Sequence, residues 1–117
     1  MNTSQPLAQG DLILVHFPFS DLTGRKLRPA LIAGRVNGDE LTLAFVTSQV
    51  SSVDARTDVI VDATDPEFQF TGLKTTSSIR LSKLATVHRR LVQRRLGTIG
   101  PVTKREVSSR LRYIFGL

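Results

Sequence analysis

Arginine and hydroxyl side chains stand where two of the expected strands begin and end. Arg28 precedes Pro29 at the start of one strand, beside a glycine-bearing loop, and Thr47 and Ser48 end another. A guanidinium is a planar fork of donors that matches phosphate oxygens, and a hydroxyl can donate to a phosphoryl oxygen. These residues would suit phosphate chemistry at the rim of a sheet. The alternatives are a surface ion pair of Arg28 with Asp21 and an ordinary hydroxyl turn at the strand end.

A second arginine, Arg80, lies in the middle of an expected strand. Its neighbours Ile79 and Leu81 are apolar, so strand alternation directs Arg80 to the opposite face. There it can meet a phosphate. An equal alternative is a cross-strand ion pair with Asp58 or Asp62.

The residue inventory narrows the chemistry further. The chain has no cysteine, which excludes disulfides and thiol nucleophiles. Its two histidines, His16 and His88, are far apart and form no ligand-spaced pair, which argues against a zinc site. No apolar run approaches the roughly 20 residues of a membrane span, and the first residues lack an apolar signal core. We therefore expect a soluble cytoplasmic protein without a metal.

Charge is distributed unevenly along the 117 residues. Residues 1–82 carry seven Lys/Arg and nine Asp/Glu, a net of −2, whereas residues 83–117 carry nine Lys/Arg and one Glu, a net of +8. A basic surplus of this kind is typical of proteins that bind polyanions such as nucleic acids. The alternatives are a solvated basic face and a docking surface for an acidic protein.

Short apolar runs alternate with turn signals, which predicts a mainly β chain. Asn37-Gly38 predicts a hairpin turn, and the alternation of Leu41, Leu43 and Phe45 directs these three toward the core. The alternation slips at Lys83-Leu84, which predicts a bulge. The expected strands cover Asp11–Phe17, Arg28–Val36, Leu41–Thr47, Asp58–Asp62 and Ser77–Leu91, with loops over residues 19–27 and 48–57.

The end of the chain changes to a helical period. Thr103 and Glu106 fit a capping box, with Pro101 just before the helix, and Gly116 suits the position after the last turn. The apolar residues at helical spacing are Val107, Leu111, Ile114 and Phe115. We expect a loose tail over residues 1–9 and one domain over residues 10–117, a small barrel of five to seven strands with a C-terminal helix packed on it.

Four motifs in register resemble those of the PemK/MazF-like toxins of type II toxin–antitoxin systems. Together they cover about residues 10–117. They are Gly10-Asp11 with residues 16–24 and 27–32, residues 45–49, residues 71–74 with 78–81 and 83–87, and residues 95–99 before the final helix.

The resemblance implies a fold and a function. The fold is an SH3-like barrel, usually a homodimer. The function is sequence-specific cleavage of single-stranded RNA, such as mRNA, through the 2′-hydroxyl and without a metal or organic cofactor. The partner is a cognate antitoxin whose disordered tail covers the RNA groove.

The resemblance also assigns roles to residues. Arg28 and Thr47 match the family's catalytic arginine and threonine, and Arg80 matches an arginine that some relatives use. Ser82, however, stands where those relatives carry an aspartate as general base, and a neutral serine is a poor base. No other base is evident, since His16 fits a structural role in its strand better. The RNA-contacting candidates are Phe19, Thr23, Lys26, Ser48, Gln49, Arg89 and Arg90.

Two rival interpretations remain at this stage. The same barrel occurs in CcdB-like toxins, which bind a protein target such as DNA gyrase without catalysis, and the lack of an evident base keeps that interpretation open. An inactive regulatory relative is the other.

Overall fold

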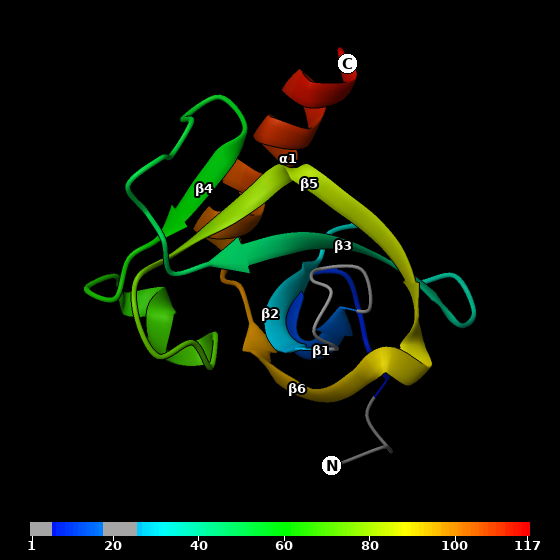
Figure 1. Ribbon diagram of the computed structural model, residues 1–117. Coiled ribbons are helices and arrows are strands. Elements are labelled where there is room, and N and C mark those ends of the chain that lie inside the picture. Colours follow the sequence, from blue (N-terminus) through cyan, green and yellow to red (C-terminus); the bar gives the residue numbers. More distant parts are fainter. Residues whose placement is uncertain (1–5, 18–25) are drawn as a thin grey trace.

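A single six-stranded sheet organises the protein. The computed structural model describes residues 6–17 and 26–117, and the sheet lies within these residues. The strands pair antiparallel in the order β4-β5-β3-β2-β1-β6, and Figure 1 shows how β5 arches over β3 while β6 closes the lower side. Their bounds are β1 (Asp11–Phe17), β2 (Lys26–Ile32), β3 (Glu40–Thr47), β4 (Asp58–Val61), β5 (Ser77–His88) and β6 (Val92–Thr98). The predicted mainly β class with one C-terminal helix is confirmed.

Most predicted strands are present, with corrected ends. The second predicted strand begins at Lys26 rather than Arg28, because Lys26 pairs with Phe17 on β1. It ends at Ile32 rather than Val36. The last predicted strand stops at His88, because the His88 side chain accepts the Arg90 N–H and starts the short 3₁₀ helix η2 (Arg89–Leu91).

Strand β6 is absent from the predicted ranges. Its residues Gln93, Arg94 and Arg95 are exposed and polar, so it has no apolar alternation to detect. Charged side chains are common on edge strands because they discourage pairing with other chains. Asp65 precedes the 3₁₀ helix η1 (Pro66–Phe70) and caps it by accepting the Glu67 N–H.

Both faces of the sheet are buried. The first core lies on the face toward helix α1 and contains Leu12, Leu31, Ala33, Ala44, Val46, Val59, Val61, Ile79, Leu81, Ile99 and Val107. The second core lies on the other face and contains Ile13, Val15, Ala30, Ile32, Leu41, Leu43 and Val87, with Phe45 packed against it. The predicted inward alternation of β3 is therefore confirmed, and the intervening residues are buried as well.

A bulge in β5 decides which side chains face which core. Ala44 on β3 lies opposite Leu84, but the next residue, Phe45, lies opposite Arg80, so residues 81–83 are skipped. Skipping an odd number of residues exchanges the two faces. Ile79 and Leu81 consequently enter the first core, whereas Arg80 turns to the face of the second. The bulge predicted at Lys83-Leu84 is confirmed at the edge of the skipped segment.

Helix α1 (Pro101–Phe115) packs behind β4 and β5 (Figure 1). It begins before Thr103, so the predicted capping box is wrong. The carboxylate of Glu67 on η1 performs the capping instead, accepting the N–H groups of Val102 (3.2 Å) and Thr103 (3.5 Å). A side chain at Gly100 would collide with Glu67, so the close approach of this carboxylate requires a glycine.

The C-terminal end of α1 follows the prediction. Gly116 adopts a left-handed conformation with φ of 69°, and its N–H donates to carbonyl oxygens of the last turn. None of the helices in the described residues has both the length and the apolar character needed to cross a membrane.

The tail expected over residues 1–9 falls partly outside the described residues. In the part that is described, the Ala8 N–H donates to Asp11 Oδ2 (2.9 Å), and Gln9 Nε2 donates to the Ala33 carbonyl (3.0 Å). Leu7 packs against the second core. These last residues before β1 are held against the sheet.

Candidate active site

Strand register brings the three predicted catalytic residues to one face of the sheet. Phe45 on β3 lies opposite Ala30 on β2 and opposite Arg80 on β5. Side chains two residues apart share a face of a strand. Arg28, two residues before Ala30, and Thr47, two residues after Phe45, therefore lie on the same face as Arg80, where the second core gives way to polar residues.

These three side chains surround a surface cavity of about 460 Å³. One wall is formed by β2, β3 and the starts of β4 and β5, and the other by the loop over residues 48–57. The lining residues are Arg28, Phe45, Val46, Thr47, Gln49, Ser51, Ser52, Val53, Asp58, Ser78 and Arg80. The cavity thus combines two guanidinium groups with several hydroxyls and one carboxylate.

The Thr47 hydroxyl is oriented by its own turn. Its Oγ1 accepts the Gln49 N–H at 3.0 Å. With that lone pair engaged, the hydroxyl hydrogen is directed elsewhere and can donate to a ligand oxygen. The turn that sequence analysis offered as an alternative to a functional Thr47 is present and is compatible with that function.

Two buried donors in the cavity lack protein partners. Within the described residues, neither the Arg80 Nε nor the Ser78 Oγ has a hydrogen-bond partner, although both atoms are buried. Buried polar groups are nearly always hydrogen-bonded, so each such atom requires an explanation. A phosphate oxygen or a hydroxyl of a bound ligand would supply the missing partner. Arg28, in contrast, is exposed at the rim.

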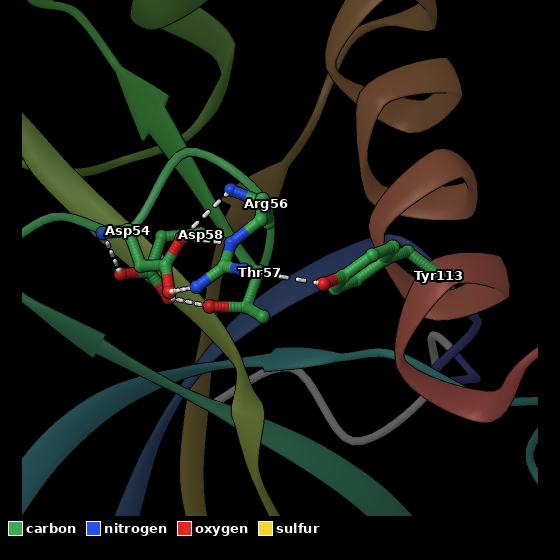
Figure 2. A network of polar contacts seen from close by, with 5 residues as sticks. All are labelled: Asp54, Arg56, Thr57, Asp58 and Tyr113. Carbon is green, nitrogen blue, oxygen red and sulfur yellow. Dashed lines mark hydrogen bonds and ion pairs between the residues drawn. The ribbon is translucent and has the colours of Figure 1, made fainter.

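A network of polar contacts holds the wall formed by the 48–57 loop. The Asp58 carboxylate accepts the Asp54 N–H (3.0 Å) and the Thr57 hydroxyl (3.3 Å). The Asp54 carboxylate in turn binds the Arg56 guanidinium (3.2 Å), which reaches the Tyr113 hydroxyl on α1 at 3.5 Å. Figure 2 shows these five residues linking the start of β4 to the helix. The loop is therefore anchored at both the cavity and α1.

The ion pair between Asp54 and Arg56 persists under mildly acidic conditions. The side-chain hydrogen bond from Arg56, aided by the Arg56 backbone N–H, lowers the pKa of Asp54 from its usual value. A carboxyl with a lowered pKa keeps its charge, and its contribution to stability, until the pH falls through that lowered value.

Two residues with no assigned role in the sequence analysis also line the cavity. Asp58 was considered only as an ion-pair partner of Arg80; it lies opposite Arg80 in the β4–β5 ladder, but no ion pair joins them among the described residues. Ser78 lies opposite Thr47. Only the register of β4 and β5 around the bulge shows that these residues belong to the site, and no local pattern signals it.

The predicted RNA-contacting residues are distributed unevenly. Gln49 lines the cavity, Ser48 is exposed beside Thr47, and Lys26 is exposed on β2 two residues before Arg28. Phe19 and Thr23 lie outside the described residues.

Arg89 and Arg90 lie far from the cavity. They follow His88, which pairs with Glu40 at the opposite end of β3 from Thr47. At roughly 3.3 Å per residue along a strand, the two ends of β3 are on the order of 20 Å apart. The structure does not bring this arginine pair to the site.

The sequence offers two weak candidates for the general base, His16 and Ser82, and neither of them lines the cavity. His16 pairs with Leu27 and neighbours Val15, which belongs to the second core, so the pleat turns His16 to the opposite face. Ser82 lies in the skipped segment of β5 and is exposed. A search of the described residues finds no group of three or more His, Cys, Asp or Glu side chains able to hold a metal ion.

Comparisons with known structures show the same fold. One similar structure is an endoribonuclease in complex with its cognate antitoxin from a mycobacterial species, with 16% identity, a TM-score of 0.74, and coverage of 96% of this chain and 97% of that chain. A second mycobacterial endoribonuclease has 17% identity and a TM-score of 0.70, covering 97% and 94%. The Mycobacterium tuberculosis toxin MazF-mt6 has 21% identity and a TM-score of 0.70, covering 92% and 97%.

Sequence comparison identifies the family. No curated protein matches the chain in sequence. The profile of the family described as PemK-like, MazF-like toxin of type II toxin-antitoxin system matches residues 8–115. This match spans nearly the whole chain and agrees with the four motifs in the sequence. The chain therefore belongs to the PemK-like, MazF-like toxin family of type II toxin–antitoxin systems.

Proposed function

We propose that this chain, as one domain over residues 10–117, is the toxin of a toxin–antitoxin pair and a metal-independent, sequence-specific endoribonuclease that cleaves single-stranded RNA. The observation that carries the proposal is the cavity where Arg28, Thr47 and Arg80 converge, with the Arg80 Nε buried and unpartnered among the described residues. Membership of the toxin family, and the similarity in fold to two mycobacterial endoribonucleases, support it.

The geometry suits a reaction in which RNA supplies its own nucleophile, the 2′-hydroxyl. The protein must then hold the phosphate in line and stabilise the negative charge that develops on its oxygens. Arg28 and Arg80 supply the charge from two different strands, and the Thr47 hydroxyl adds a neutral donor. Arginine stays protonated in proteins, so charge stabilisation rather than proton transfer is the role that we assign to both arginines.

The first test is RNA cleavage in the presence of a chelator. We expect the purified protein to cut a long RNA at defined sites at the same rate with and without excess EDTA, because none of its proposed catalytic groups needs a metal. Gel analysis of the products measures this. Activity that EDTA abolishes and a divalent ion restores would contradict the metal-free mechanism. No cleavage under either condition would favour a non-catalytic, CcdB-like binding role.

We further propose a homodimer, acting in the cytoplasm where mRNA is available, and inhibited by a cognate antitoxin. One mycobacterial neighbour is itself a complex with its cognate antitoxin, which supports the last point. Exposed apolar side chains on α1, among them Tyr113 and Phe115, offer surface for a subunit interface.

The oligomeric state is directly measurable. We expect sedimentation at micromolar concentration to give twice the 12.9 kDa mass of the chain. A modest core in a chain of this size leaves room for an interface to contribute to stability. A single monomeric species across that concentration range would rule the homodimer out.

A further inference from the structure

Cleavage through the 2′-hydroxyl needs a proton acceptor, and neither Ser82 nor His16 lies where it can serve. We infer that Asp58 is the general base of this site, an assignment that rests on the proposed ribonuclease function. Among the residues that line the cavity, Asp58 is the one with a carboxylate. Its position on β4, its neighbours and its remaining hydrogen-bonding capacity all suit this role.

The pleat of β4 directs Asp58 toward the cavity. Val59 and Val61 point into the first core, so Asp58 points to the opposite face. In the β4–β5 ladder Asp58 is the direct partner of Arg80. Directly opposed side chains in an antiparallel pair lie about 5 Å apart at Cβ. The carboxylate therefore belongs to the same face, and the same cavity, as the arginine that we assign to the phosphate.

Asp58 is held in position but is not saturated. It is only 2% exposed, and each of its oxygens accepts one hydrogen bond, from the Asp54 N–H and from the Thr57 hydroxyl. The Arg110 side chain reaches the backbone carbonyl of Asp58 and leaves the carboxylate untouched. An ionised carboxylate has about four acceptor positions. Lone pairs thus remain for a substrate hydroxyl, on a group whose rotamer the loop already fixes.

The surrounding charges suit a base beside a phosphate. A carboxylate facing a phosphodiester is repelled by it, and the guanidinium groups of Arg28 and Arg80 in the same cavity offset that repulsion. Arg80 makes no ion pair with Asp58 among the described residues, so neither group takes up the hydrogen-bonding positions of the other. In a structural ion pair, by contrast, the carboxylate and the guanidinium would be hydrogen-bonded to each other.

The cleavage step replaces one bond at phosphorus by another. The Asp58 carboxylate takes the proton of the 2′-hydroxyl while the 2′-oxygen bonds to phosphorus. The bond between phosphorus and the 5′-oxygen breaks, and that oxygen takes a proton from water. The products are a 2′,3′-cyclic phosphate and a 5′-hydroxyl, and Asp58 returns its proton to solvent.

The test uses the full chain and an RNA oligonucleotide containing one site mapped from parental cleavage. We expect Asp58→Asn to lower kcat by about 10²- to 10⁴-fold, the usual contribution of a positioned base. The asparagine oxygen still accepts the Asp54 N–H, so the loop should keep its anchor. Affinity for the same RNA carrying a 2′-deoxy nucleotide at the cut should stay within about threefold of the parent. Asp58→Ser, which also keeps an acceptor oxygen, should show the same loss.

Asp54→Asn is the matched control, because Asp54 anchors the same loop without lining the cavity. It should cleave at near parental rate. Equal losses of rate and affinity in the Asp54 and Asp58 variants, or unfolding of both Asp58 variants, would identify Asp58 as a structural anchor and overturn the assignment. Near-parental cleavage by Asp58→Asn would overturn it too. A parent that cleaves no RNA would instead refute the ribonuclease function itself.

A second RNA substrate tests whether Asp58 accepts the proton of the 2′-hydroxyl or donates a proton to the leaving group. Replacing the 5′-bridging oxygen at the cut by sulfur creates a leaving group that departs without protonation. The loss in Asp58→Asn should persist on this RNA, because the 2′-hydroxyl must still lose its proton. Disappearance of the loss would make Asp58 the donor to the leaving group and overturn its assignment as base.

Discussion

Replacing Arg28 by alanine is expected to lower RNA cleavage by about 10²-fold or more while the fold survives. One preorganised donor to a developing oxyanion is typically worth 10²–10³ in rate. Arg28 is exposed at the cavity rim, so its truncation leaves no hole in either core. Thr47→Ala should cause a comparable loss. Single-turnover cleavage of an RNA with one mapped site measures both, on protein checked by circular dichroism and thermal melting.

The controls for this prediction are Arg28→Lys and Ser82→Ala. Lysine should also be poor, because one ammonium does not reproduce the bidentate fork of a guanidinium. Ser82→Ala should cleave at near parental rate, since Ser82 lies exposed in the β5 bulge. Near-parental rates in both alanine variants at Arg28 and Thr47 would place the active site elsewhere. Loss of activity together with loss of fold would make the two residues structural.

Arg80→Ala is expected to have the second large effect, again about 10²-fold on cleavage. Its Nε is a buried donor without a partner in the described structure, which is where a ligand oxygen gains most from a charged hydrogen bond. Arg80 does not belong to either core, so removing the unpaired group should leave the melting temperature unchanged or slightly higher. The measurement is again single-turnover cleavage, with melting on the same samples.

The double variant Arg89→Ala/Arg90→Ala tests whether the loss of cleavage in Arg80→Ala reflects the position of Arg80 in the cavity or only the loss of a positive charge. It removes two positive charges near the end of β3 that lies far from the cavity. The rate at which bound RNA is cleaved should change by less than about threefold. RNA binding itself can weaken, because salt-dependent phosphate contacts are lost. A loss of bound-state rate equal to that of Arg80→Ala would show that general positive charge, rather than the cavity, drives catalysis.

The fold class, and the choice of Arg28, Thr47 and Arg80 as candidate site residues, follow from the amino-acid sequence. A continuous apolar run over residues 12–15 located β1 closely, and the alternation of Leu41, Leu43 and Phe45 located β3. Gly116 marked the end of α1, since its left-handed backbone favours glycine. The resemblance to the toxin family selected Arg28, Thr47 and Arg80, and the structure places all three around one cavity.

The remaining features depend on contacts between segments far apart in the chain, so they appear only in the folded structure. The sequence predicts that Thr103 caps the final helix. The cap of α1 is instead supplied by Glu67 from η1, more than thirty residues away in the chain. Strand β6 is defined by pairing with β1, since its own residues are too polar to signal a strand. Asp58 reaches the site only through its register with Arg80, and the face of Arg80 depends on the odd number of residues skipped in β5. A one-residue change in that count would exchange every side chain at this end of β5 between core and cavity. The slip in alternation at Lys83-Leu84 signals the bulge, but the number of residues skipped depends on the pairing of β5 with β3.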